Sequence, residues 1–163
     1  MIDECGDEMK SGKVLFCASA GGHYTELLQL ESLINKYSGV IVTERTKISM
    51  EERNLPIKYL PYGSRSEGFV YFFKFLYVCI LSIIYFIQYR PKVIISTGVH
   101  STIPICVLGW LFGRKVIYIE TIAVVNKPTI TGKVMYKIAT GFYVQWKELL
   151  EVYPEAIYGG ALF

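Results

Sequence analysis

Two histidines lie where an apolar run gives way to glycine and then to a helix-like segment. The first is in ASAGGHYTEL, residues 18–27, where Gly21 and Gly22 precede His23. Glycines in such a turn let backbone N–H groups approach an anion at the start of the following helix. Histidine has an ordinary pKa of about 6.5, so a neutral imidazole can accept a proton near neutral pH. The turn could therefore bind an anion and remove a proton, although a purely structural tight turn fits the same residues.

Two further turns carry side chains that could do chemistry. The order of strand, glycine, histidine and helix recurs around Gly98 and His100, and His100 could bind a ligand or only cap and pack the next helix. Glu120 follows the apolar run KVIYI. A carboxylate there is costly unless it has a partner or a function, so it is either a site residue or the partner of a loop lysine or arginine.

Short β-branched runs alternate with helix-like segments along the whole chain. The predicted strands cover residues 13–19, 39–44, 57–62, 92–97, 115–121, 141–146 and 156–160, and the predicted helices cover residues 25–37, 69–89 and 101–112. This alternation predicts an α/β fold with a doubly wound parallel sheet. Ligands of such a sheet lie beyond the carboxyl ends of the strands, so the three turns should face one crevice.

The composition restricts the classes of protein. A chain of 163 residues, 52% of them hydrophobic, suits one domain with a large core. We expect residues 1–12 to form a disordered tail that is not a signal peptide, and residues 13–163 to form a single domain. A net charge of +3 without a basic run argues against nucleic-acid binding. Four cysteines without a C-x-x-C pair indicate reduced thiols in a cytoplasmic setting rather than a disulfide framework or a zinc site.

The segment of residues 69–89 is apolar throughout, with Lys74 as its only charged residue. Its first nineteen residues would form a helix about 28 Å long, which is enough to cross a bilayer. A span would separate the strands on either side of it, which one sheet does not allow. We therefore favour a helix lying in the membrane interface over a spanning or a wholly buried helix. The residues assigned to membrane contact are Arg65, Tyr71, Phe72, Lys74 and Phe75, with the three aromatic rings facing outward.

Several motifs in order carry a resemblance to a known family. They are SAGGH from residue 19, YGSR from residue 62, the run of residues 93–121, KPTITGKVMYKIATGFYVQW from residue 127 and YPEAIYGGALF from residue 153. With these motifs the chain resembles the acceptor-binding membrane subunit of two-chain glycosyltransferases. That family includes bacterial proteins of capsular and exopolysaccharide synthesis and the membrane subunit of the eukaryotic enzyme that adds the second N-acetylglucosamine to dolichol diphosphate. The chain is more distantly similar to the N-terminal half of the peptidoglycan N-acetylglucosaminyltransferase.

The resemblance implies the Rossmann-like N-terminal half of a GT-B glycosyltransferase. This half would hold a polyprenyl-diphosphate-linked sugar, while a partner chain binds the UDP-sugar. The transfer needs a base for the acceptor hydroxyl, and we choose His23 first and Glu120 as the alternative. No metal ion and no cofactor is expected. The residues expected to contact the acceptor are Ser19, Gly21, Gly22, Thr97, Gly98, His100, Ser101, Asn126 and Lys133.

The last residues are expected to bind the donor-binding partner. The final predicted strand is followed by only three residues, at the point where single-chain GT-B enzymes cross to their second domain. The residues assigned to this contact are Tyr158, Gly159, Gly160, Leu162 and Phe163. We expect the protein at the cytoplasmic face of a bacterial inner membrane, held there by residues 69–89. Two alternatives stay open: a membrane scaffold that activates its partner without a catalytic group, and a small-molecule-binding Rossmann domain with its own nucleotide.

Overall fold

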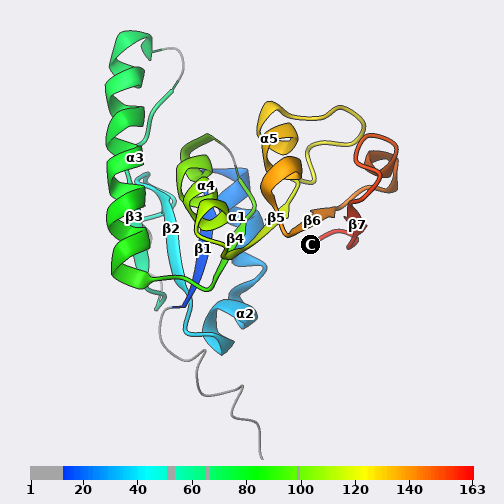
Figure 1. The fold of residues 1–163 in the computed structure, drawn as a ribbon, viewed down its shortest axis with the longest axis horizontal. Coiled ribbons are helices and arrows are strands. Elements are labelled where there is room, and N and C mark those ends of the chain that lie inside the picture. Colours follow the sequence, from blue (N-terminus) through cyan, green and yellow to red (C-terminus); the bar gives the residue numbers. More distant parts are fainter. Residues whose placement is uncertain (1–12, 51–53, 65–66, 99) are drawn as a thin grey trace, which may run out of the picture.

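Seven parallel strands form the centre of the structure, a computed structural model that describes residues 13–50, 54–64, 67–98 and 100–163 (Figure 1). The strands are β1 (Val14–Ala18), β2 (Val40–Glu44), β3 (Ile57–Leu60), β4 (Val93–Ser96), β5 (Lys115–Ile119), β6 (Gly141–Val144) and β7 (Ile157–Tyr158). Their order is β3-β2-β1-β4-β5-β6-β7, and every neighbouring pair is parallel. The seven predicted strands and the doubly wound fold are thus confirmed. The predicted disordered tail and Arg65 lie outside the described residues.

Helices cover both faces of the sheet, because successive strand residues point to opposite sides. The helices are α1 (Gly22–Leu28), α2 (Glu31–Lys36), α3 (Phe69–Tyr89), α4 (Ile103–Leu111) and α5 (Ile130–Ile138), with the short 3-10 helices η2 (His100–Thr102) and η3 (Lys147–Leu150). Leu15 and Cys17 belong to the core beneath α3, α4 and α5, whereas Phe16 and Ala18 belong to the core beneath α1 and α2. β1 therefore contributes side chains to both cores. Its carboxyl end lies at the edge of the sheet where ligands of a doubly wound fold bind.

Two helix predictions need correction. The single helix expected over residues 25–37 is interrupted around Gln29 and Leu30, so that α1 and α2 are separate. The sequence reading also missed α5, in which a glycine and a threonine weaken the helical pattern. Its start does carry a local signal, because Thr129 caps the helix by accepting a hydrogen bond from the backbone N–H of Gly132 at 2.7 Å.

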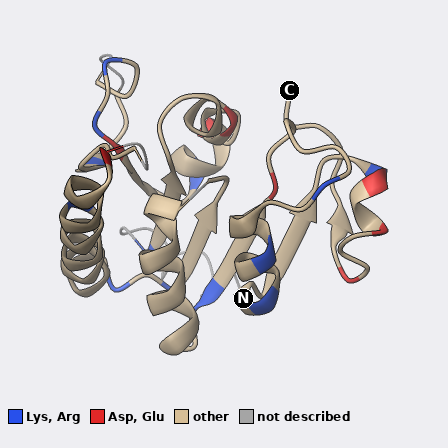
Figure 2. Cartoon of the chain, turned by 90° about the horizontal axis from the view of Figure 1, so that it is seen from above, with Lys and Arg blue, Asp and Glu red and all other residues tan. Residues whose placement is uncertain are grey.

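Helix α3 stands at the edge of the molecule with an apolar face open to solvent (Figure 1). Only 11% of the most apolar 18-residue stretch of this helix is buried, and its length and composition would allow it to cross a membrane. Seen from above, α3 and α4 are drawn almost without charged residues (Figure 2). The exposed large apolar side chains of α3 are those of Phe69, Val70, Phe72, Phe73, Leu76, Tyr77, Ile80, Ile83, Ile84 and Ile87. We call these ten residues the α3 stripe; they exclude the wholly buried helix considered above.

Two of the three aromatic residues expected to face outward from α3 do not. Phe72 is exposed, as expected. Tyr71 and Phe75 are half-buried and stack on each other, and the Tyr71 ring meets His100 edge-on with 5.7 Å between ring centroids. The helical period of 3.6 residues places positions 71 and 75 on the side that faces η2, away from the stripe.

Candidate active site

The turn after β1 and the turn after β4 pack directly against each other. Gly98 makes this approach possible: a Cβ atom there would lie 2.8 Å from the backbone nitrogen of Ser19 and 3.2 Å from Cβ of His23. Thr97 fixes the same contact by donating a hydrogen bond from Oγ1 to the backbone oxygen of His23 at 2.8 Å. The structure therefore brings together four of the sequence-predicted site residues at the carboxyl edge of the sheet.

The backbone of Thr97 also determines which nitrogen of His23 carries a hydrogen. His23 Nδ1 lies 2.8 Å from the backbone oxygen of Thr97. A carbonyl oxygen can only accept, so Nδ1 must be the donor, and the lone pair of the neutral ring is then on Nε2. The His23 side chain is 24% exposed, so a ligand can reach it. The geometry thus leaves Nε2 as the atom that can take a proton from a bound molecule.

Glu26, which the sequence analysis did not single out, lies behind His23. Its buried carboxylate accepts hydrogen bonds on Oε1 from Thr121 Oγ1 at 2.8 Å and from the backbone N–H of Ile122 at 2.9 Å. Its other oxygen, Oε2, lies 4.0 Å from His23 Nδ1 and has no hydrogen-bond partner among the described residues. Glu26 therefore joins the His23 turn to the loop after β5 and places a negative charge behind the imidazole. Its position three residues after His23 on one helix is the signal that could have identified it.

Glu120 is the second buried carboxylate of the site, with only 1% of its surface exposed. Oε1 accepts hydrogen bonds from the backbone N–H of Thr121 at 3.2 Å and from the Tyr118 hydroxyl at 3.4 Å, and Oε2 accepts one from Thr129 Oγ1 at 3.2 Å. Burial raises the pKa of Glu120, although these hydrogen bonds and the charge of His23 act in the opposite direction. Within the described part of the chain no lysine or arginine forms an ion pair with Glu120, so the ion-pair alternative is not realised there.

The surroundings of Glu120 leave no spare room on the side of α5. A Cβ atom on Gly132 would collide with Glu120 Oε2 and with the Tyr153 hydroxyl. Burial and the nearby Glu120 carboxylate raise the pKa of Tyr153, and the same causes raise the pKa of Tyr118. Both tyrosines therefore stay neutral and remain possible hydrogen-bond donors. The carboxylate of Glu120 is held in place by close packing as well as by hydrogen bonds.

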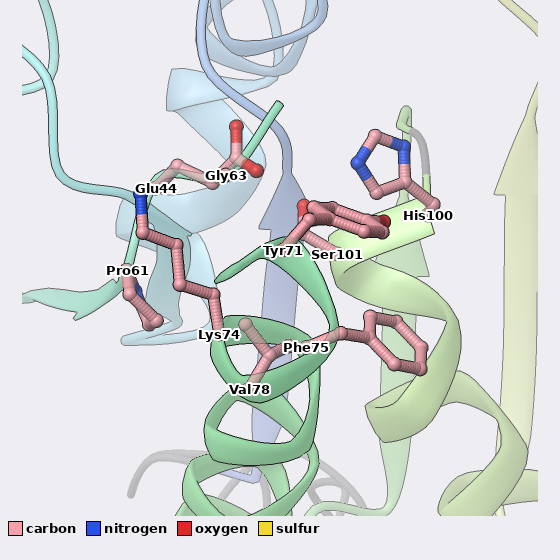
Figure 3. A pocket seen from close by; sticks show the side chains of 9 residues that line it. All are labelled: Glu44, Pro61, Gly63, Tyr71, Lys74, Phe75, Val78, His100 and Ser101. Atoms are coloured by element: carbon pink, nitrogen blue, oxygen red, sulfur yellow. The ribbon is translucent and has the colours of Figure 1, made fainter. Parts of the chain in front are cut away.

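The second histidine lines a small pocket to which His23 does not contribute. His100 and Ser101 line it together with Tyr71 and Lys74 from α3 and with Glu44 from the end of β2 (Figure 3). Its volume of about 10 Å³ admits little more than one water molecule. The Glu44 carboxylate accepts a hydrogen bond from the backbone N–H of Ala20 at 3.0 Å, so the pocket wall supports the His23 turn from behind. The two turns with the same sequence pattern thus place their histidines in different surroundings, His23 against the backbone of Thr97 and His100 against the ring of Tyr71.

The remaining predicted contacts lie on more open surfaces. Asn126 and Lys133 are exposed, in the loop after β5 and on α5. Tyr158 and Phe163 are exposed at the opposite edge of the sheet from α3.

Gln145 ties the last residues of the chain to Glu120. Its Oε1 accepts a hydrogen bond from the backbone N–H of Leu162 at 2.9 Å, and its Nε2 donates one to the backbone oxygen of Glu120 at 3.0 Å. The neighbouring Trp146 donates from Nε1 to the backbone oxygen of Ile122 at 2.7 Å. One short path of hydrogen bonds therefore runs from the predicted partner surface to the candidate active site.

Comparisons with known proteins identify a family for this chain and agree with its fold. The family model described as "Oligosaccharide biosynthesis protein Alg14 like" matches residues 65–162. The mouse UDP-N-acetylglucosamine transferase subunit ALG14 is 28% identical over 182 aligned positions, which cover 94% of this chain and 84% of the mouse protein. The subunit of the same name from Candida albicans is 32% identical over 93 positions, covering 53% of this chain and 42% of that protein.

Solved structures of similar fold are longer than this chain. MurG from Acinetobacter baumannii superimposes with a TM-score of 0.63 at 20% identity, covering 84% of this chain and 42% of MurG. UDP-GlcNAc 2-epimerase from Methanocaldococcus jannaschii gives a TM-score of 0.61 at 13% identity, with 85% of this chain and 40% of the epimerase covered. These likenesses concern the fold, and they confirm a Rossmann-like half of the GT-B type. Since the family model covers more than half of its residues, the chain belongs to the Alg14-like family of oligosaccharide biosynthesis proteins.

Proposed function

We propose that this protein is the acceptor-binding, membrane-associated subunit of a two-chain glycosyltransferase. Its partner chain would bind a UDP-sugar, and the sugar would pass to a polyprenyl-diphosphate-linked sugar held by this chain. The observation that carries the proposal is that His23 and the buried carboxylate of Glu120 both lie at the carboxyl edge of the sheet, near enough for the charge of His23 to act on the pKa of Glu120, with His23 Nε2 left to accept a proton. The names of the relatives, which are transferase subunits, support the same reaction class.

The geometry suggests a direct route for the proton. The acceptor hydroxyl attacks the anomeric carbon of the donor, the new C–O bond forms as the bond to UDP breaks, and UDP leaves on the partner's side. His23 Nε2 takes the hydroxyl proton. The resulting imidazolium is stabilised by the Thr97 backbone oxygen on Nδ1 and by the Glu26 carboxylate behind it. Ser19, Gly21 and Gly22 lie in the same turn, and we assign them to acceptor contact.

Helix α3 is proposed to hold the protein on the membrane. Its ends lead into β3 and β4, which belong to one sheet, so the helix would lie along the bilayer with the α3 stripe in the interface. The described free cysteines Cys17, Cys79 and Cys106 are at least partly buried, which suits a reducing compartment. We therefore propose the cytoplasmic face of a membrane as its location, and the resemblance to bacterial capsular and exopolysaccharide proteins leads us to propose the bacterial inner membrane.

The donor-binding partner is proposed to dock at β7 and the last residues. Tyr158 and Phe163 are 45% and 63% exposed, and aromatic side chains of this kind are common anchors of interfaces. Docking there would reach Glu120 through Gln145, so the contact would also position the active site.

The partner surface can be tested by co-purification. Changing Tyr158 and Phe163 together to alanine should weaken binding of the donor-binding chain by more than about tenfold, since two interface anchors typically contribute more than 1 kcal/mol each. Phe69→Ala is the matched control, because Phe69 is exposed on α3, far from β7. Transfer activity should fall with binding and return at high partner concentration. Undiminished pairing of the double variant would place the interface elsewhere.

A further inference from the structure

A groove with basic groups at its rim lies between α3 and α4, at the end remote from His23. It has a volume of about 510 Å³, within the roughly 300–1,000 Å³ of small-ligand sites. Its walls are the side chains of Ile83, Phe86, Ile87, Leu108 and Phe112, and its charged residues are Arg90 and Arg114. The rings of Phe86 and Phe112 pack against each other where the two helices meet, with 5.3 Å between ring centroids.

The backbone of each arginine is held at the end of a helix, and neither arginine has an acidic partner among the described residues. The backbone N–H of Arg90 donates to Phe86 at the end of α3, and that of Arg114 donates to Gly109 at the end of α4. No carboxylate in the described ranges forms an ion pair with either guanidinium. The two helix C-termini contribute only about half a negative charge each, so two full positive charges dominate the rim. The groove therefore combines an apolar floor with an unneutralised site for an anion.

We propose that this groove binds one anionic phospholipid of the membrane, with an acyl chain between α3 and α4 and its phosphate between Arg90 and Arg114. The groove is continuous with the α3 stripe, since Ile83 and Ile87 belong to both. Exposed Trp110 and Leu111 extend the apolar surface beside it. A lipid that enters from the membrane would thus place its acyl chain against the apolar walls and its phosphate beside the two arginines.

The lipid of this groove is distinct from the glycosyl acceptor. Arg90 follows the C-terminus of α3 and Arg114 precedes β5, whereas His23 and Glu120 lie at the carboxyl ends of their strands. Helix α3 alone is about 30 Å long, so a phosphate at Arg90 cannot belong to a substrate whose sugar reaches His23 directly. The inference rests on the proposed membrane attachment but not on catalysis, and its test needs neither the partner nor the donor.

The test compares vesicles of phosphatidylcholine with vesicles that also contain phosphatidylglycerol. The wild-type chain should bind the anionic vesicles more tightly. In the double variant Arg90→Gln/Arg114→Gln the ratio of the two affinities should fall about thirtyfold, because each lost charge contributes about 1 kcal/mol. Lys36→Gln/Lys137→Gln is the control, because it removes two exposed charges from α2 and α5. It should keep the preference. Equal preference in the arginine and lysine variants would overturn the proposal.

A second variant separates a lipid site from general surface charge. Leu108→Trp fills the groove and leaves both arginines in place. Detergent-extracted wild-type protein should retain phosphatidylglycerol in equimolar amount by mass spectrometry, and Leu108→Trp should lose it while still binding vesicles through the α3 stripe. Inorganic phosphate should not displace the lipid. Retention of only zwitterionic lipid, or a dimer of this chain that Leu108→Trp dissociates, would contradict the assignment. Because both arginines are exposed, their variant decides the question even if Leu108→Trp does not fold.

Discussion

Replacing His23 with asparagine should lower turnover of the reconstituted two-chain enzyme by about 10²–10⁴-fold, the usual contribution of a general base. The asparagine amide can still donate to the backbone oxygen of Thr97, so the turn should keep its shape. It has no counterpart of Nε2, so the proton of the acceptor hydroxyl has no acceptor. Turnover at saturating donor and acceptor measures the effect, and pull-down of the partner should be unchanged.

His100→Asn is the comparison for this experiment. The His100 ring lies edge-on against Tyr71 in a small pocket that His23 does not line, so its loss should change turnover by less than about tenfold. If the chain is only a scaffold, the loss of His23 should leave turnover nearly unchanged. If His23→Asn and Glu120→Gln both turn over at near-normal rates with the partner bound, this chain contributes no chemical group and acts only by recruitment.

Glu120→Gln should lower turnover about hundredfold, because it removes a negative charge near the imidazolium that forms at His23, and it should at the same time stabilise the fold at neutral pH. Burial raises the pKa of Glu120 above its ordinary value of 4.5, so the folded protein favours the protonated carboxyl. The stabilising contribution of the protonated Glu120 carboxyl is then complete below pH 4.5 and is lost as the pH rises through the raised pKa. Glutamine carries no charge at any pH, so the variant lacks this loss, and its melting temperature should exceed that of the wild type near pH 8.

Glu67→Gln provides a control of opposite sign. The pKa of Glu67 is lowered by its hydrogen bond and ion pair with Lys74, at 2.8 Å on the surface. Its removal should not raise the melting temperature at pH 8. A Glu120→Gln variant that melts below the wild type at pH 8, or that keeps full activity, would show that the carboxylate is neither strained by burial nor required.

The sheet could be predicted from the sequence because each strand is a short β-branched run with a turn signal at its end. Helix α5 was missed, since Thr131 and Gly132 interrupt its apolar pattern and only the Thr129 cap marks its start. Helix α3 was expected with the correct bounds, because a long apolar run allows few alternatives.

The site could be predicted only in part, for a physical reason. His23 and Glu120 stand out because a histidine beside glycines and a carboxylate after an apolar strand are locally unusual. Glu26 is not unusual on a helix, and its partners Thr121 and Ile122 are about a hundred residues away in the sequence. His100 repeats the sequence pattern of His23, yet packing against Tyr71 directs it elsewhere. Which side chains meet in the site is decided by contacts between segments distant in the sequence, and a local pattern does not reveal these contacts.

We propose above all that this chain holds the acceptor and that a partner chain holds the donor. The most direct test is equilibrium binding to the purified chain alone, in detergent, of labelled polyprenyl-diphosphate-N-acetylglucosamine and of labelled UDP-N-acetylglucosamine. We predict saturable binding of the lipid-linked sugar, and this binding should weaken when access to His23 is blocked. The UDP-sugar should show no saturable binding until the partner is added. Tight binding of the UDP-sugar by this chain alone, with none of the lipid-linked sugar, would contradict the account.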